Sequence, residues 1–186
     1  MTLERAGRVS KLRAWALAAL VVACRVPREV HEPREYPATK LQSSHMSLAL
    51  SDPRPAPTDP TERQLLLPPS FEGRARARLD AMVSGSGPAL DVSISVAALD
   101  ELEIVDARGE MTRVLVRFDV VVAQNGGPVL RRAETQSRAD LPRDEATPEE
   151  VALVLDSTAL DAFDRYFADP HWVDAMNQEL AARAAQ

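Results

Sequence analysis

Residues 90–141 have the sequence LDVSISVAALDELEIVDARGEMTRVLVRFDVVVAQNGGPVLRRAETQSRADL, in which apolar and polar side chains alternate over three stretches. Strict alternation places every second side chain on one face of an extended chain, so each stretch predicts a half-buried strand. The longest apolar series consists of Val114, Val116, Phe118, Val120 and Val122. Asn125-Gly126-Gly127 follows it and predicts a tight hairpin, because asparagine and glycine tolerate positive φ. Residues 106–110 predict the preceding turn.

Helices are predicted before and after these strands in the sequence. Ser70 is a candidate N-cap for a helix over residues 70–82, which carries an apolar face. Thr147-Pro148-Glu149-Glu150 is a capping box with proline at the first helical position, so a second helix begins there. Asp169-Pro170 predicts the start of a short C-terminal helix.

The order of these elements predicts the fold class. Residues 46–50 alternate briefly and add a first strand, which gives the order β-α-β-β-β-α with the C-terminal helix appended. We expect an α+β, two-layer sandwich with a mainly antiparallel sheet of about four strands and helices on one face. The other sheet face carries alternating charges and can meet water.

The N-terminal residues have the pattern of a secretory signal. Residues 1–13 are basic, and residues 14–23 carry no charge. Ten residues rise only ~15 Å as a helix, about half of the hydrocarbon thickness of a bilayer, so a membrane span is not expected. The single cysteine, Cys24, follows directly.

Val21-Val22-Ala23-Cys24 resembles a bacterial lipobox. The resemblance implies that residues 1–23 are a cleaved lipoprotein signal peptide and that Cys24 is acylated, with palmitate for example, as the first mature residue. The alternative is that Cys24 is a buried apolar residue at the end of an uncleaved signal. Arg25 stands where enterobacterial lipoproteins retained in the inner membrane tend to have Asp, which favours the outer membrane; the inner membrane is the alternative.

The remaining chain is predicted to be a tether and one domain. Residues 24–44 are polar and contain three prolines, which predicts a flexible tether. Residues 45–186 predict a single α+β periplasmic domain interrupted by a proline-rich loop over residues 53–69, which Leu65, Leu66 and Leu67 can pin to the core.

Composition excludes several classes of protein. The formal net charge is -6, which argues against a nucleic-acid binder. The chain has one cysteine and three histidines that are far apart in sequence, His31, His45 and His171, so we expect no cysteine-based zinc site, no other metal site and no cofactor. Cleavage after residue 23 would make the chain more acidic, so membrane attachment would depend on the acyl group rather than on anionic lipids.

Candidate catalytic residues are few. Asp100, Glu101 and Glu103 lie close in sequence and would suit acid–base chemistry, but a solvated turn explains them as well. His171 beside Asp169 would suit an oriented base, but Asp169 also suits a helix N-cap. We therefore predict that the chain is not an enzyme, unless a cleft joins these groups to a second polar group.

Two further features suit binding. Trp172 is a candidate partner contact, because exposed tryptophans anchor interfaces; the alternative is that it packs the terminal helix onto the sheet. Arg74, Arg76 and Arg78 suit an anion site, or else a solvated helix face.

The mature chain resembles the YajG-type family of uncharacterised bacterial outer-membrane lipoproteins. The shared marks are Cys24, Asp52-Pro53-Arg54, a helix ending near Gly85, Ala123-Gln124-Asn125-Gly126, and Phe167-Ala168-Asp169-Pro170. The prolines of residues 53–69 depart from that pattern. The resemblance implies a lipid-anchored protein of the outer membrane that faces the periplasm.

We therefore predict a non-enzymatic interaction or accessory protein of the cell envelope. Its partner would contact the edge strand over residues 46–50, the edge strand over residues 129–141, or the uncovered sheet face. The topology also resembles auxiliary lipoproteins of ABC transporters that move lipid between membranes. That alternative requires an apolar groove between helix and sheet with an opening to solvent.

Overall fold

A computed structural model of the chain describes residues 34–57 and 64–185. The described elements, in chain order, are β1 (Met46–Ser51), α2 (Ser70–Met82), β2 (Leu90–Asp106), β3 (Gly109–Gln124), β4 (Val129–Pro142), the 3₁₀ turn η1 (Arg143–Glu145), α3 (Pro148–Phe167) and α4 (Pro170–Ala184). This is the predicted order, with α4 as the C-terminal helix.

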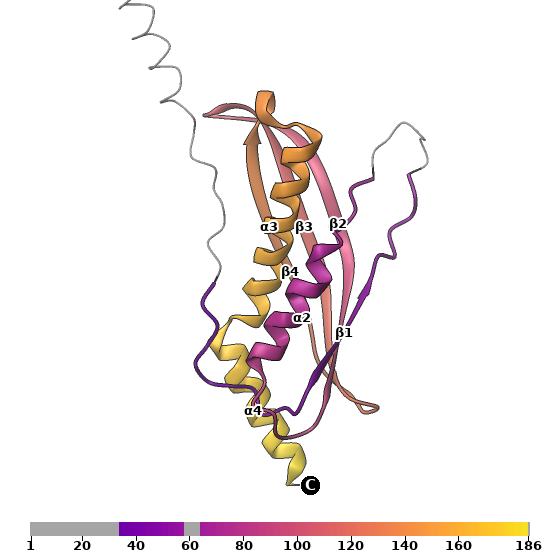
Figure 1. The fold of residues 1–186 in the computed structure, drawn as a ribbon, viewed down its shortest axis with the longest axis vertical. Coiled ribbons are helices and arrows are strands. Elements are labelled where there is room, and N and C mark those ends of the chain that lie inside the picture. The colour runs from indigo at the N-terminus through magenta and orange to yellow at the C-terminus, as the bar shows by residue number, and fades with distance from the viewer. Residues whose placement is uncertain (1–33, 58–63, 186) are drawn as a thin grey trace, which may run out of the picture.

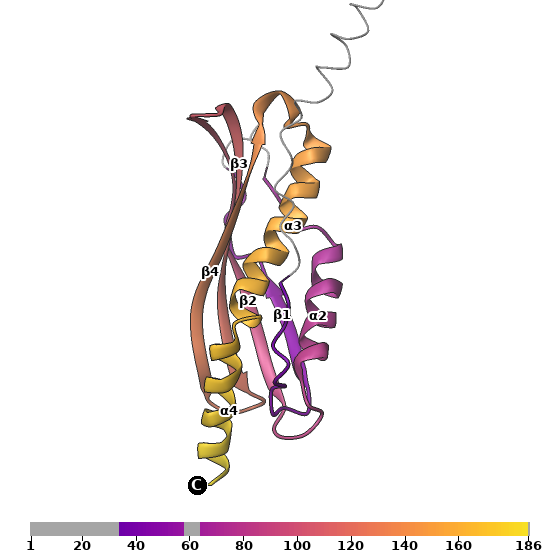
Figure 2. The ribbon, with the colours of Figure 1, turned by 90° about the vertical axis from the view of Figure 1, so that its left-hand side faces the viewer.

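The four strands form one mixed sheet in the order β1-β2-β3-β4 (Figure 1). β1 runs parallel to β2, with Met46 opposite Leu90 and Ser51 opposite Ser95, and the other two pairs are antiparallel. Figure 2 shows the sheet as one layer and α2 and α3 as the other. The predicted two-layer α+β sandwich is confirmed.

The core lies between these two layers. Phe118 on β3, Phe71 on α2 and Phe163 on α3 are fully buried, and the ring of Phe71 lies 5.5 Å from that of Phe118 and 6.3 Å from that of Phe163, between centroids. The apolar series of β3 therefore faces the helices, as the alternation predicts. Burying these aromatic side chains together with the aliphatic core stabilises the packing of the two layers.

Two of the three predicted helix caps are confirmed. The Thr147 side chain accepts a hydrogen bond from the Glu150 backbone N–H (3.3 Å), and the Asp169 carboxylate accepts one from the His171 backbone N–H (2.9 Å). The predicted Ser70 cap is wrong, because α2 already includes Ser70. The Ser70 hydroxyl instead donates to the Asp156 carboxylate on α3 (3.3 Å).

The β3–β4 hairpin turns where the sequence predicts it. The Gly127 N–H donates to the Gln124 carbonyl (2.7 Å), and Gly126 has a φ of +65°. Asn125 does not adopt positive φ, because in the described chain only glycines do so. A side chain other than glycine at position 126 would be strained.

β2 is longer than the alternation predicts. A bulge between Val96 and Ala98 shifts the register, and the strand then continues to Asp106. The expectation that Asp100, Glu101 and Glu103 form a solvated turn is therefore wrong, because they pair with residues 112–115 of β3. The extra residue of the bulge moves the next side chains to the opposite face and interrupts the period-two pattern.

Candidate functional site

Cys24, the predicted lipidation site, lies outside the described residues. The described chain begins at Arg34, ten positions later. Residues 34–44, which we call the strap, belong to the stretch predicted as a tether, and the structure places them against the helices. The strap is therefore the part of the predicted tether that joins the domain.

Backbone hydrogen bonds join the strap to the end of α2. The Leu41 N–H donates to the Met82 carbonyl, the Ser84 N–H donates to the Leu41 carbonyl (both 2.9 Å), and the Leu41 side chain is fully buried. On α4, the Asn177 side chain accepts from the Gln42 N–H (2.7 Å) and donates to the Lys40 carbonyl (3.1 Å). These contacts fix residues 40–43 from two sides.

Two buried carboxylates on α3 hold the first part of the strap. The Tyr36 hydroxyl donates to Asp164 (2.5 Å), which also pairs with Arg78 of α2 (2.9 Å). Arg34 pairs with Asp161 (3.3 Å), which in addition pairs with Arg165 (2.8 Å). Each buried carboxylate thus has a partner on the strap in addition to an arginine on the helices, and these added contacts favour the docked position of the strap.

The hydroxyl of Tyr36 stays protonated in this cluster. Burial raises the pKa of Tyr36 well above its usual value, and the hydrogen bond to the Asp164 carboxylate raises it further. Arg78 acts in the opposite direction. A neutral tyrosine can donate to Asp164, whereas a tyrosinate would repel it.

The predicted partner contact at Trp172 lacks an exposed side chain. Trp172 is 8% exposed, and its ring lies 5.4 Å from that of Tyr166 and 5.2 Å from that of Phe167, between centroids. This burial favours the alternative in which Trp172 packs α4 onto the domain.

The candidate catalytic groups do not meet in a cleft. Asp169 serves as the α4 N-cap, and His171 is exposed. Because side chains alternate along a strand, Asp100 lies on one face of β2, and Glu101 and Glu103 lie on the other. Within the described residues, no three histidine, cysteine or acidic side chains could hold a metal ion, and no helix is long and apolar enough to cross a membrane.

The arginines of α2 are all engaged with carboxylates. Arg74 pairs with Asp156, Arg76 with Glu72 (2.9 Å) and Arg78 with Asp164 (2.9 Å). Two of these partners lie on α3, so the arginines join the two helices. None of these three guanidinium groups is unpaired, which disfavours the alternative of an anion site.

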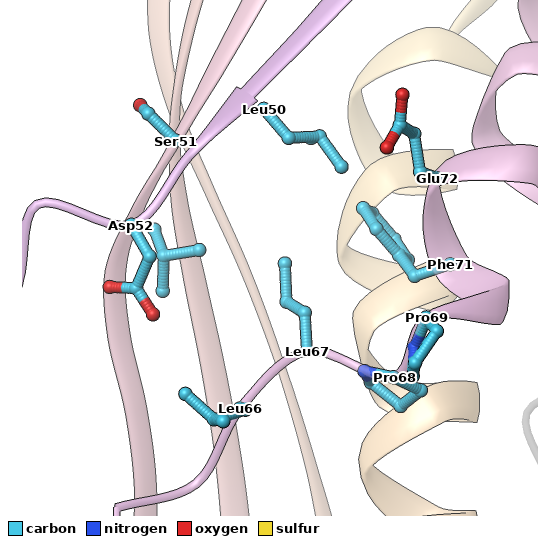
Figure 3. A pocket seen from close by; sticks show the side chains of 10 residues that line it. Leu50, Ser51, Asp52, Leu66, Leu67, Pro68, Pro69, Phe71 and Glu72 are labelled. Atoms are coloured by element: carbon cyan, nitrogen blue, oxygen red, sulfur yellow. The ribbon is translucent and has the colours of Figure 1, made fainter.

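Sequence reasoning did not locate the groove between β1 and the start of α2 (Figure 3). It has a volume of about 280 Å³ and is lined mainly by apolar side chains, among them Leu50, Leu67, Phe71 and Val96. Asp52 and Glu72 also line it, and hydrogen bonds from Arg54 hold the pKa of Asp52 below its usual range. The groove is smaller than the ~300–1,000 Å³ of ordinary ligand sites, and its carboxylates disfavour an acyl chain with an anionic headgroup. The sequence signal for it was the run of leucines at residues 65–67, of which Leu66 and Leu67 line the groove.

No protein-family model and no curated protein matches the chain. Solved structures that resemble it include a minor lipoprotein from Acinetobacter baumannii, with 12% identity, 75% of this chain and 94% of that chain covered, and a TM-score of 0.42. Another is the rare lipoprotein B from Shewanella oneidensis (15% identity, 76% and 96% covered, TM-score 0.41). A third is described as a homologue of a neuraminyllactose-binding hemagglutinin, from Helicobacter pylori (8% identity, 84% and 100% covered, TM-score 0.43). Likenesses this low assign neither a family nor a function to the chain.

Proposed function

We propose that the chain is a lipid-anchored lipoprotein of the bacterial cell envelope. In this proposal its small domain faces the periplasm from the outer membrane and contacts another envelope component without catalysis. The proposal includes membership of the YajG-type family. The observation that carries it is the position of the single cysteine, Cys24, at the end of an uncharged stretch that follows a basic one.

The strap bears on this proposal because it begins close to Cys24 in the sequence. The ten residues that follow Cys24, up to Arg34, can span at most about 35 Å in any conformation. Two or three acyl chains on Cys24 would hold the protein essentially permanently. The domain would therefore stay near the membrane surface and meet partners there.

A non-catalytic role is supported by the state of the polar side chains. The buried carboxylates Asp161 and Asp164 each pair with arginines, and the exposed His171 has no acidic side chain bonded to its ring among the described residues. An enzyme needs an acid, base or nucleophile that converges with other groups on one point. The described candidates show no such convergence, which favours the proposed non-catalytic role.

Metabolic labelling with an alkyne analogue of palmitate tests the anchor. We expect label on the wild-type chain in the outer-membrane fraction, and none on a Cys24→Ala variant expressed to the same level. The matched control is Ser44→Ala, an exposed strap position that should label like wild type. An unlabelled wild-type chain would overturn the proposal.

A further inference from the structure

Part of β2 is an unpaired edge of the sheet. β1 pairs with β2 only as far as Ser51 opposite Ser95, whereas β2 continues to Asp106. All of β1 is paired, and Figure 1 shows the chain that follows it leading away from the sheet. Among the described residues no other strand covers that side of β2. We call residues 100–106 the acidic edge.

The direction of the backbone groups at this edge follows from one hydrogen bond. The Leu99 carbonyl accepts from Arg54 (3.3 Å), so Leu99 directs its backbone away from β3. In an antiparallel pair the outward-facing residues alternate, so Glu101, Glu103 and Val105 also direct their N–H and C=O groups outward. These groups form a template for one more strand.

The side chains of the acidic edge are exposed and mostly acidic. Glu103 pairs with Arg143 (3.0 Å) and Asp106 with Arg108 (2.8 Å), whereas Asp100 and Glu101 have no ion pair within the described part of the chain. Two large apolar side chains are also exposed here, Leu102 (45%) and Val105 (80%). An edge with these properties is attractive to a strand that is both basic and aliphatic.

We propose that the acidic edge binds an extended basic segment of another envelope protein as an additional strand. The inference deepens the interaction role proposed above and rests on it. Lysine or arginine at alternate positions of the partner would face Glu101 and Glu103, and aliphatic residues between them would face Leu102 and Ile104. Pairing between the acidic edges of two copies of the chain is disfavoured, because their carboxylates would lie opposite one another.

The β1 edge is a weaker template. Its Leu48 carbonyl already accepts a hydrogen bond from Arg76 of α2 (3.4 Å), which obstructs an incoming strand. Leu48 and its neighbours also lie beside α2, whereas the acidic edge has charged side chains open to solvent. Electrostatic attraction therefore directs a basic segment to β2.

The test is fluorescence anisotropy with the full chain in detergent micelles. The probe is a labelled peptide of alternating lysine and valine, and controls are the same peptide with a central proline and a peptide of alternating glutamate and valine. We expect the lysine peptide to bind, and each control peptide to bind at least about tenfold more weakly. Binding should weaken with added salt.

Variants locate the binding. The double change Asp100→Lys and Glu101→Lys should lower affinity for the lysine peptide at least about tenfold and raise it for the glutamate peptide. The matched control, Asp80→Lys with Asp174→Lys, makes the same charge change at exposed helix positions and should bind like wild type. Glu103→Pro removes an outward N–H without removing a ladder hydrogen bond, and should weaken binding more than Glu103→Gln.

The outcomes separate this inference from the anchor. Equal loss in both double variants, equal binding of the proline-containing peptide, or no binding by the wild type would overturn the proposal for the acidic edge. So would self-association of the wild type that the Asp100→Lys and Glu101→Lys changes abolish, because a second copy would then be the occupant. None of these results alters the palmitate labelling, which tests Cys24 alone.

Discussion

Arg54 lies at the start of the proline-rich loop, and its planar guanidinium donates hydrogen bonds to four acceptor atoms. It donates to both carboxylate oxygens of Asp52 (2.8 and 2.7 Å), to the Leu65 carbonyl (2.7 Å) and to the Leu99 carbonyl (3.3 Å). The side chain is only 15% exposed. One residue therefore joins the two ends of the loop to β2. Lysine lacks this fork of donors.

Arg54→Lys is expected to lower the free energy of unfolding by about 1–3 kcal/mol, because it leaves the part-buried carbonyls of Leu65 and Leu99 without this donor. Urea unfolding followed by circular dichroism measures this. Arg183→Lys is the matched control: Arg183 is 38% exposed and forms an i,i+4 pair with Glu179, so the change should cost less than about 0.5 kcal/mol. Equal effects of the two changes would show that Arg54 does not close the loop.

At the scale of elements, Asp140 joins three parts of the sheet. On β4, it accepts from Arg113 of β3 (2.8 Å) and from Arg108 in the β2–β3 turn (2.7 Å). The hydrogen bonds from Arg113, then those from Arg108, hold the pKa of Asp140 below its usual value, against the opposing effect of burial. The end of the sheet at the β2–β3 turn is thus stabilised by ion pairs as well as by the backbone hydrogen bonds between the strands.

This pKa shift predicts an acid-dependent stability. A carboxylate with a lowered pKa stabilises the fold above its unfolded pKa of about 3.9, and the contribution is lost as pH falls through the lower folded value. Asp140→Asn should therefore lower the free energy of unfolding by about 0.5–1 kcal/mol at pH 7, since both arginines are partly exposed, and should flatten its decline below about pH 4. The matched control is Asp119→Asn, at an exposed position on β3 without an ion pair among the described residues, which should lower the free energy of unfolding at pH 7 by less than about 0.5 kcal/mol. A profile for Asp140→Asn parallel to wild type would contradict this prediction.

The elements differ in how far the sequence predicts them. β3 is predictable because every second side chain from Val114 to Val122 faces the helices without interruption. The outer half of β2 is not, because the bulge at Val96 and Ala98 reverses its faces and leaves Leu102 exposed. The helix caps at Thr147 and Asp169 follow from local chemistry, whereas the groove beside Phe71 depends on contacts between distant segments, which a single sequence does not display.

At the scale of the whole molecule, the strap shows why the boundary between a tether and a domain is hard to predict from amino-acid composition. Its contacts with α3 and α4 join residues 127–137 positions apart in sequence, as in Arg34 with Asp161 and Lys40 with Asn177. Tyr36 and Leu41 are the only large apolar or aromatic side chains of the strap, too few for any periodic pattern. The buried partners of the strap are themselves polar, so hydropathy alone does not identify them.

If the strap is part of the cooperative fold, Leu41→Ala should destabilise the whole domain by about 2–5 kcal/mol, because it leaves a cavity beside the end of α2. Tyr36→Phe should cost about 1–3 kcal/mol, because Asp164 loses a donor in a buried cluster. Urea unfolding of the full chain measures both, and each should shift one single transition. Leu153→Ala is the matched control, since Leu153 is 63% exposed on α3 and should change stability by less than about 0.5 kcal/mol. A Leu41→Ala variant as stable as Leu153→Ala would mean that the strap detaches without cost and that the tether extends to residue 44.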